Sequence, residues 1–446
     1  MTLSDLENKI AAGEVDTVLT VFPDVFGRLI GKRITASQFL EHTAREGTHS
    51  CNYLLTLNLE MEPQEGFKLS NWESGYGDFE MRPDLDTLRL LPWEPGSAMV
   101  LCDLYGHEGA RVEEAPRSVL RRQIERFSEC DLGCKLASEL EFFLFNQSAH
   151  DAFEKDYRAL SPSSDYRIDY HTMQTARDEP IMRAIRNQMP LARIPIESTK
   201  GEWGKGQHEV NFIYAEPLPI GDLHCIFKQG ARQIADQHGK CLTFMPKPWA
   251  EEVGSSCHIH LSVWQGDTNL FGTEPGGSLL FKRFLAGLIK YSRELSYFFA
   301  PTINSYKRYQ SASWAPTKLA WACDNRTVGF RVVGQGASLR IENRLPGADA
   351  NPYLAFAAMM AAGLAGIREE LECPPIYSGN AYTDHALPAL PGSLRDAAEL
   401  LHASTIARTA LGDAVVDFYV HTARLEARAF DNAVTDWERR RYFEQI

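Results

Sequence analysis

Four short segments of this chain carry polar side chains at every second position, and this alternation restricts the possible folds more than any other feature. A β-strand places alternate side chains on the same face, so each segment predicts a strand with one charged face. The interleaved residues Leu140, Val210, Ile259 and Ile341 are apolar and predict a buried opposite face. The segments span residues 137–145, 205–214, 255–264 and 338–345.

The charged faces carry Glu, His, Arg, Gln and Asn rather than the Lys, Thr and Ser of an ordinary solvated surface. For any single segment, a plain solvated face remains an open interpretation. Four such segments together favour one curved sheet whose polar faces converge into a funnel. The polar positions are Glu139, Glu141, Gln207, Glu209, Asn211, His258, His260, Ser262, Arg340, Glu342 and Arg344.

The residue types on these faces indicate metal binding and phosphoryl transfer. Carboxylates combined with one or two imidazoles suit hard divalent cations such as Mg²⁺ or Mn²⁺. The absence of Cys from these faces disfavours structural zinc. Arginines beside metal-binding carboxylates suggest an anion lying across the metals, and phosphoryl transfer needs this arrangement.

The length of the chain limits how many domains it can form, and its net charge limits the kinds of partner it can bind. A chain of 446 residues predicts one large domain and a smaller one. We place the boundary in the polar stretch near 105–114, which gives domains 1–107 and 108–446. The net charge of −13 argues against nucleic acid as the main partner. Neither of the common glycine-rich phosphate loops is present.

The nine cysteines are scattered without a C-x-x-C pair, which favours reduced thiols in the cytoplasm. The polar, acidic N-terminal stretch does not look like a signal peptide. The longest apolar run, 353–367, is too short for a membrane span and predicts a buried helix. We therefore expect a cytoplasmic protein with no membrane partner.

Hydrophobic periodicity predicts the main elements. Strand-like runs in the first 105 residues are 17–24, 52–62 and 97–104. Helices are expected at 118–133, 220–239, 278–300 and 351–372, followed by a mostly helical segment at 393–432.

Several motifs, in their order along the chain, resemble the glutamine synthetase family. They are "ELEFFLF", "GEWGKGQHEVNF", "FMPKP", "GSSCHIHLS", "NSYKR", "NRTVGFRV" and "RIENRLPGADANPYLAFA". The match covers about residues 115–446, and the first hundred residues fit the family's small N-terminal domain more loosely. Such an ordered set is far more specific than any one motif.

The resemblance implies an α+β fold. A small β-grasp N-terminal domain would precede a catalytic domain with a curved antiparallel sheet forming a funnel, surrounded by helices. Family members assemble as stacked ring homo-oligomers, often dodecamers, with active sites between neighbouring subunits. We therefore expect a ring homo-oligomer, and a dodecamer in particular.

The resemblance also assigns site residues. One metal would be held by Glu141, Glu202 and Glu209, and the other by Glu139, His258 and Glu342. The nucleotide contacts would be His260, Ser262, Arg331 and Arg340. Arg326 would stabilise the transferring phosphoryl group. The substrate-binding residues would be Gly254, Arg308 and Arg344, with Arg308 also acting in catalysis.

The implied reaction has two steps and uses Mg²⁺ or Mn²⁺, with ATP as co-substrate. ATP phosphorylates the γ-carboxylate of glutamate, because a carboxylate oxygen is a poor leaving group. A nitrogen nucleophile then displaces phosphate and forms an amide.

Two departures from the family pattern bear on that nucleophile. Ammonia-using members carry a flap Glu where this chain has Trp314, and the Asp motif of their N-terminal domain is not found. The corresponding region offers Tyr53, Trp72 and Tyr76. Aromatic rings suit a larger amine, because cation–π attraction contributes about 0.5–2 kcal/mol. The chain thus resembles the branch that joins glutamate to primary amines or polyamines.

Alternatives remain open at this point. Trp314 could simply pack within the flap, and the protein could be an ordinary glutamine synthetase or a non-catalytic structural member. Val253 stands where many members have Asn, which bears on the choice of acid substrate. Tyr382 lies near a position that some members adenylylate, but its surroundings match poorly and predict a surface tyrosine.

Overall fold

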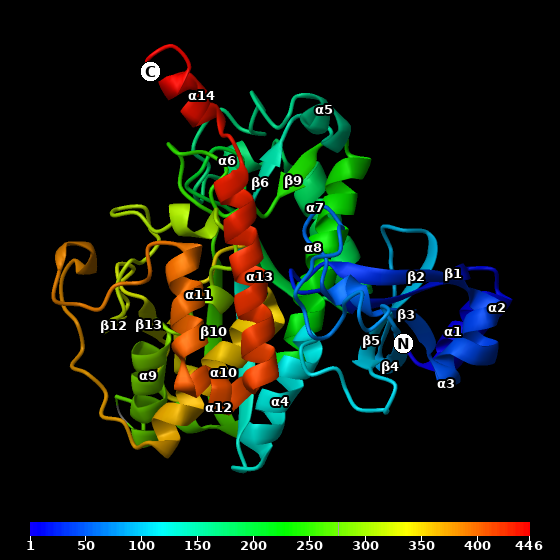
Figure 1. The fold of residues 1–446 in the computed structure, drawn as a ribbon, viewed down its shortest axis with the longest axis horizontal. Coiled ribbons are helices and arrows are strands. Elements are labelled where there is room, and N and C mark those ends of the chain that lie inside the picture. Colours follow the sequence, from blue (N-terminus) through cyan, green and yellow to red (C-terminus); the bar gives the residue numbers. More distant parts are fainter. Residues whose placement is uncertain (275) are drawn as a thin grey trace.

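A computed structural model describes residues 1–274 and 276–446, and it contains two sheets with helices packed around the larger one (Figure 1). The N-terminal sheet has the strand order β2-β1-β5-β4-β3. Its strands are β1 (Val15–Pro23), β2 (Leu29–Thr35), β3 (Thr48–Cys51), β4 (Asp78–Leu90) and β5 (Gly96–Tyr105). The small helices of this part are α1 (Leu3–Ala11), α2 (Ala36–Gln38) and α3 (Ala44–Glu46).

Two of the three strands expected in this part are confirmed. Runs 17–24 and 97–104 fall in β1 and β5, which pair in parallel. The strand expected at 52–62 is wrong, because this segment forms a 3₁₀ turn at Asn52–Leu55 and then a tight loop. In that loop the Asn58 side chain accepts a hydrogen bond from the Glu62 backbone N–H, a contact that favours a turn over a strand.

The larger sheet has nine strands. Its main path is β12-β13-β14-β10-β6-β8-β7, with β11 beside β10 and β9 beside β6. All pairs are antiparallel except β12 with β13 at one edge, so the expected antiparallel sheet is correct apart from that edge. The strands are β6 (Gly133–Phe145), β7 (Ile196–Gly201), β8 (Gln207–Phe212), β9 (Cys241–Thr243), β10 (Cys257–Gln265), β11 (Thr268–Asn269), β12 (Trp321–Cys323), β13 (Phe330–Val333) and β14 (Arg340–Asn343).

Helices cover this sheet, and most lie where the periodicity predicts them (Figure 1). The helix expected at 118–133 ends at Ser128, and Gly133 begins β6 instead. The helix expected at 278–300 ends at Tyr291 and is followed by a separate 3₁₀ turn. The helices are α4 (Pro116–Ser128), α5 (Ala149–Glu154), α6 (Thr172–Thr175), α7 (Glu179–Leu191), α8 (Pro217–Gln237), α9 (Leu279–Tyr291), α10 (Pro352–Arg368), α11 (Leu394–Ala403), α12 (Thr405–Leu411), α13 (Asp413–Asn432) and α14 (Asp436–Tyr442).

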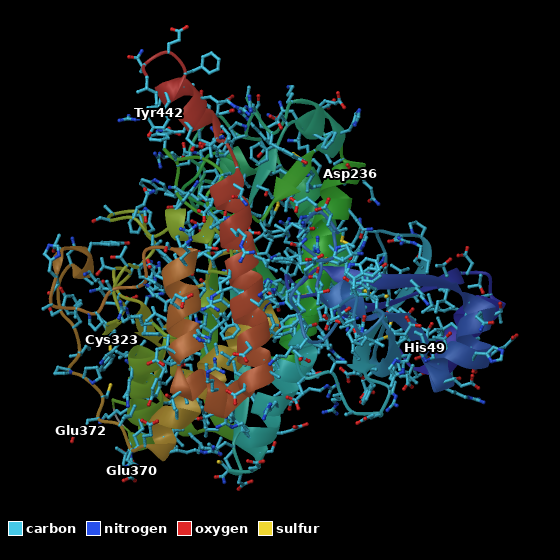
Figure 2. All side chains as sticks on the ribbon, viewed as in Figure 1. His49, Asp236, Cys323, Glu370, Glu372 and Tyr442 are labelled. Carbon is cyan, nitrogen blue, oxygen red and sulfur yellow. The ribbon has the colours of Figure 1, made fainter. Side chains whose placement is uncertain are left out.

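The apolar run at 353–367 lies in α10, and almost all of it is buried, as expected. Its small residues allow close packing against α9. A Cβ added at Gly366 would lie 2.2 Å from the backbone oxygen of Arg283. Within the described ranges, no helix combines the length and apolarity needed to cross a membrane. All nine cysteines are free, including the exposed Cys323 labelled in Figure 2.

A buried ionic network joins the N-terminal sheet to the helices of the larger part. Arg117 on α4 is 2% exposed and pairs with Asp84 of β4, Asp103 of β5 and Asp222 of α8. Tyr353 on α10 donates a hydrogen bond to Asp222. We propose that the domain division falls in the loop between β5 and α4, consistent with the boundary expected from the sequence.

Candidate active site

The register of neighbouring strands brings the polar faces together. Glu139 of β6 lies opposite His258 of β10 and also opposite Asn211 of β8. His260 lies opposite Glu342 of β14, on the far side of β10. Because β14, β10, β6 and β8 are adjacent, their polar faces form one continuous wall, as the alternation predicts. The interleaved residues are fully buried beneath it.

A cavity of about 640 Å³ lies over this wall. It brings together most of the site residues predicted from the sequence. These are Glu139, Glu141, Glu202, Glu209, Gly254, His258, Arg308, Trp314, Arg326, Arg331, Glu342 and Arg344. The remaining three, His260, Ser262 and Arg340, line a second cavity of about 760 Å³ that shares Glu139 with the first.

One group of carboxylates consists of Glu141, Glu202 and Glu209, each of which can place one oxygen within 4.8 Å of the others. Burial, reinforced by repulsion from Glu202, raises the pKa of Glu141. Burial and the neighbouring carboxylates raise the pKa of Glu209 to about 9. Carboxylates that repel each other in this way suit a divalent cation, since all the donors are oxygens.

The second group is centred on Glu139. Its carboxylate lies 3.3 Å from His258 Nδ1, which lies 3.5 Å from a Glu342 oxygen. Burial opposes ionisation of Glu139, but hydrogen bonds from His258 and His260 hold its pKa well below the usual range. Burial is likewise outweighed at Glu342, where Arg344 and the two histidines lower the pKa to about 2. This set of two carboxylates and one imidazole also fits Mg²⁺ or Mn²⁺.

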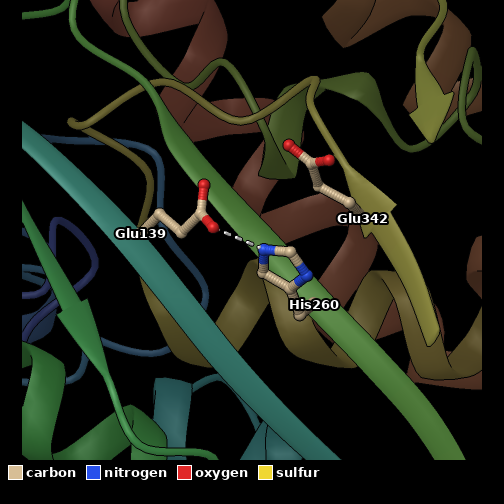
Figure 3. Close-up of side chains that lie close together, drawn as sticks. All are labelled: Glu139, His260 and Glu342. Atoms are coloured by element: carbon tan, nitrogen blue, oxygen red, sulfur yellow. Dashed lines mark hydrogen bonds and ion pairs between the residues drawn. The ribbon is translucent and has the colours of Figure 1, made fainter. Parts of the chain in front are cut away.

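His260 positions Glu139 (Figure 3). Arg340 Nε donates a hydrogen bond to His260 Nδ1 at 3.1 Å. Because Nδ1 is then an acceptor, Nε2 carries the proton and donates it to Glu139 at 2.9 Å. Arg340 and His260 therefore orient a carboxylate in the adjoining cavity, besides lining the second one.

The arginines that line the first cavity differ in whether they form ion pairs with neighbouring carboxylates. Arg344 pairs with Glu342 at 2.6 Å, and its buried Nε has no hydrogen-bond partner among the described residues. Arg331 pairs with Glu342 at 2.8 Å. Arg326 is exposed and makes no ion pair with any residue that the structure describes. An uncompensated guanidinium at a cavity wall suits an incoming anion.

Arg308 is 2% exposed and donates hydrogen bonds to the backbone oxygens of Leu345 and Arg344. Gly254 packs directly against its side chain. A Cβ at Gly254 would lie 2.4 Å from the Pro246 oxygen and 2.8 Å from Arg308 Cγ, so only glycine fits there. Val253 also lines the cavity.

Aromatic side chains form one side of the cavity. Trp314 is 50% exposed and lies beside Trp203, with 5.9 Å between ring centroids and an angle of 58°. Its backbone is left-handed, with φ of 66°, and its carbonyl accepts a hydrogen bond from Arg344. Such a conformation is uncommon for a bulky residue and is kept only where the surrounding contacts impose it.

Sequence reasoning missed three further residues that line this cavity, namely Trp203, Lys200 and Tyr170. The Lys200 ammonium contacts Glu202, lies 3.8 Å from Glu209, and sits 4.5 Å from the Tyr170 ring centre. The available signal was proximity in sequence, because Lys200 and Trp203 flank the predicted ligand Glu202.

Two other aromatic features lie elsewhere. Tyr53, Trp72 and Tyr76 cluster in the N-terminal part, with Trp72 and Tyr76 centroids 4.8 Å apart. None of the three lines either of the two cavities within the described chain. The expectation of a surface Tyr382 is only partly correct, because the residue is half-buried and its hydroxyl is fully buried.

The second cavity also has a basic and aromatic wall. Lys135 Nζ lies 3.7 Å from the Trp264 ring centre and 5.7 Å from that of Tyr214. The Trp264 indole donates a hydrogen bond to Ser262 at 2.8 Å. These flat and cationic groups suit a ring with attached phosphates.

Known proteins resemble this chain in sequence and in fold. The family model "Glutamine synthetase, catalytic domain" matches residues 113–442. The gamma-glutamylethanolamide synthetase GlnA4 of Streptomyces coelicolor is 49% identical, over 100% of this chain and 96% of its own. The glutamate–isopropylamine ligase of a Pseudomonas species is 36% identical, over 97% of this chain and 96% of its own.

The solved structure of a GmaS complex with ADP superimposes with a TM-score of 0.86 at 29% identity, covering 99% of this chain and 100% of the other. This match confirms the small N-terminal β domain and the catalytic domain with its large curved sheet. With the family's catalytic domain matched over 113–442 and relatives aligned along nearly the whole length, this chain belongs to the glutamine synthetase family of ATP-dependent ligases.

Proposed function

We propose that this protein is a glutamate–amine ligase, which activates the γ-carboxylate of L-glutamate with ATP and couples it to a small primary amine. The observation that carries this proposal is the Trp203–Trp314 pair in the cavity that also holds the carboxylate groups. An ammonium ion needs carboxylates around it, whereas two indoles offer apolar and π surface to a carbon-bearing amine.

The relatives support the same choice. The relative at 49% identity is named for its product, γ-glutamylethanolamide. The relative at 36% identity is named for the amine that it joins to glutamate, isopropylamine. Ethanolamine and isopropylamine are both small primary amines. We propose ethanolamine as the first candidate for this chain, because the relative named for it has the higher identity of these two.

We assign the two carboxylate groups to two divalent ions, Mg²⁺ or Mn²⁺. Glu141, Glu202 and Glu209, whose oxygens lie within 4.8 Å of one another, would hold one. Glu139, His258 and Glu342 would hold the other, since His258 Nδ1 lies 3.3 Å from Glu139 and 3.5 Å from Glu342. When bound, these ions would neutralise phosphate charge during transfer. The nucleotide would occupy the second cavity, against His260, Ser262 and Arg340, with its phosphates reaching Arg331 and the shared Glu139.

The remaining residues would bind and orient the reactants. Arg344 would bind the glutamate carboxylates from a wall held in place by Arg308 and Gly254. Arg326, which has no ion pair in the described chain, would stabilise charge on the phosphoryl group as a glutamate oxygen attacks and ADP leaves. The amine nitrogen would then attack the acyl carbon, phosphate would leave, and the nitrogen would lose its proton.

We also propose a ring homo-oligomer, a dodecamer in particular. The cluster of Tyr53, Trp72 and Tyr76 does not line the cavity of its own chain, and Trp72 is 76% exposed, so its ring would extend the aromatic wall of a neighbour. This arrangement would place aromatic groups on both sides of the amine.

Phosphate release tests the proposal. The protein is incubated with ATP, Mg²⁺ and glutamate, and each of ammonia, methylamine, ethanolamine, isopropylamine, putrescine and spermidine is added in turn. We expect release that depends on the amine and is faster with a small primary amine than with ammonia. The Glu139→Ala variant should lose this activity. Faster release with ammonia would leave an ordinary glutamine synthetase, and no release with any amine would reject a catalytic role.

A further inference from the structure

A third cavity lies in the N-terminal part, between α1, β4 and the turn that follows α7. Its volume is about 500 Å³, and it shares no residue with the two cavities of the active site. Two guanidinium groups, those of Arg89 and Arg193, form part of its wall. Neither guanidinium has a carboxylate partner among the described residues, so the wall of this cavity carries uncompensated positive charge that an anion could neutralise.

Arg89 on β4 is 5% exposed. Its Nε donates to the Thr87 oxygen at 2.8 Å, and Nη1 reaches the Ala192 oxygen at 3.4 Å. Its Nη2 makes no hydrogen bond, and no carboxylate lies within 4 Å of the group in the described chain. Arginines buried to this degree are rare unless paired, because losing hydration is costly for a charge.

Arg193 faces the same cavity from the turn after α7. Its backbone is left-handed, with φ of 61°, which is uncommon for a residue other than glycine. Its side chain makes only long contacts of 3.4 Å to the oxygens of Asp86 and Leu88, and it too lacks a carboxylate partner among the described residues.

The other charged groups of the cavity do not compensate these arginines. Asp5 accepts hydrogen bonds from the backbone and hydroxyl of Thr2, and Glu14 pairs with Lys9 at 2.8 Å.

We propose that this cavity binds a small dianion, either phosphate or a dicarboxylate, between Arg89 and Arg193. Guanidinium groups bind such anions through paired N–H donors. The anion would join β4 of the N-terminal sheet to the end of α7, which leads through β7 to Glu202. This proposal does not depend on the amine-ligase function.

Titration calorimetry with the full-length protein tests the site, using inorganic phosphate and succinate as separate probes. The Arg193→Gln variant should bind the preferred probe about tenfold more weakly or not at all. The Lys9→Gln variant is the matched control, because Lys9 lines the same cavity but is already paired, and it should bind as the wild type does. Phosphate bound in the active site is recognised separately, because Arg326→Gln should weaken that event and leave this one unchanged.

The two probes distinguish the two kinds of anion. Phosphate binding alone indicates a phosphate site, and succinate binding alone indicates a dicarboxylate site. Equal binding by the wild type and Arg193→Gln would overturn the proposal. The absence of any binding that Arg193→Gln affects would also overturn it, and would leave the two arginines as hydrogen-bonding links between β4 and the turn after α7.

Discussion

Replacing Trp314 by glutamate should shift the preference of the enzyme from ethanolamine towards ammonia. Trp314 is 50% exposed, so it supplies roughly half of the contact that a buried indole would give. Two methylenes at about 0.8 kcal/mol each, halved for exposure, contribute about 0.8 kcal/mol. Cation–π attraction at such a site adds about 0.5–1 kcal/mol. The lost contacts therefore amount to about 1.5 kcal/mol, or about tenfold.

The assay is the ratio of kcat/KM for ethanolamine to kcat/KM for ammonia, measured by phosphate release at saturating ATP and glutamate. Trp314→Glu should lower this ratio by about tenfold or more, because the new carboxylate also attracts ammonium. Trp314→Ala should weaken ethanolamine use without improving ammonia use. Trp437→Glu makes the same change at an exposed tryptophan of α14 and should leave the ratio unaltered.

A ratio within twofold of the wild type for Trp314→Glu, with kcat retained, would refute the reasoning. It would mean that the indole packs only within the flap, against Trp203, and does not contact the amine.

Three other changes have definite expected outcomes. Gly254→Ala forces a Cβ against the Pro246 backbone oxygen and Arg308, so the KM for glutamate should rise at least about tenfold in steady-state kinetics, and the thermal midpoint should fall as well. Arg117→Met leaves the buried Asp222 without an ion pair and removes one of the two arginine partners of Asp84 and Asp103, so it should lower the free energy of unfolding in urea by about 3–5 kcal/mol, against about 1 kcal/mol or less for the more exposed Arg121→Met. Glu209 has a folded pKa of about 9, above its unfolded value near 4.3, so its protonated form stabilises the metal-free protein at low pH, and that stability is lost as pH rises towards 9. Thermal melts in EDTA from pH 5 to 9 should therefore fall more steeply for the wild type than for Glu209→Gln, and equal slopes would contradict this reading.

The polar wall was the most predictable part of the molecule. Alternation with period two fixes which side chains share a face, and apolar residues such as Leu140 and Ile259 show which face is buried. The four strands are neighbours in the sheet, as their matching chemistry suggested. Strand order itself does not follow from the spacing, and the structure gives it.

The errors lie where local contacts outweigh periodicity. The segment 52–62 reads as a strand, but hydrogen bonds made by Asn58 turn it back on itself. The helix begun at Leu279 stops at Tyr291, before the apolar run does. Trp203 was missed because its role depends on a partner 111 positions away, at Trp314, and such a contact has no local signature.

One competition experiment tests the central claim most directly. The protein is supplied with ATP, Mg²⁺ and glutamate, together with equal concentrations of ammonia and ethanolamine, and the products are quantified by mass spectrometry. The aromatic wall formed by Trp203 and Trp314 predicts mostly γ-glutamylethanolamide. Mostly glutamine would contradict the claim that this cavity selects a carbon-bearing amine.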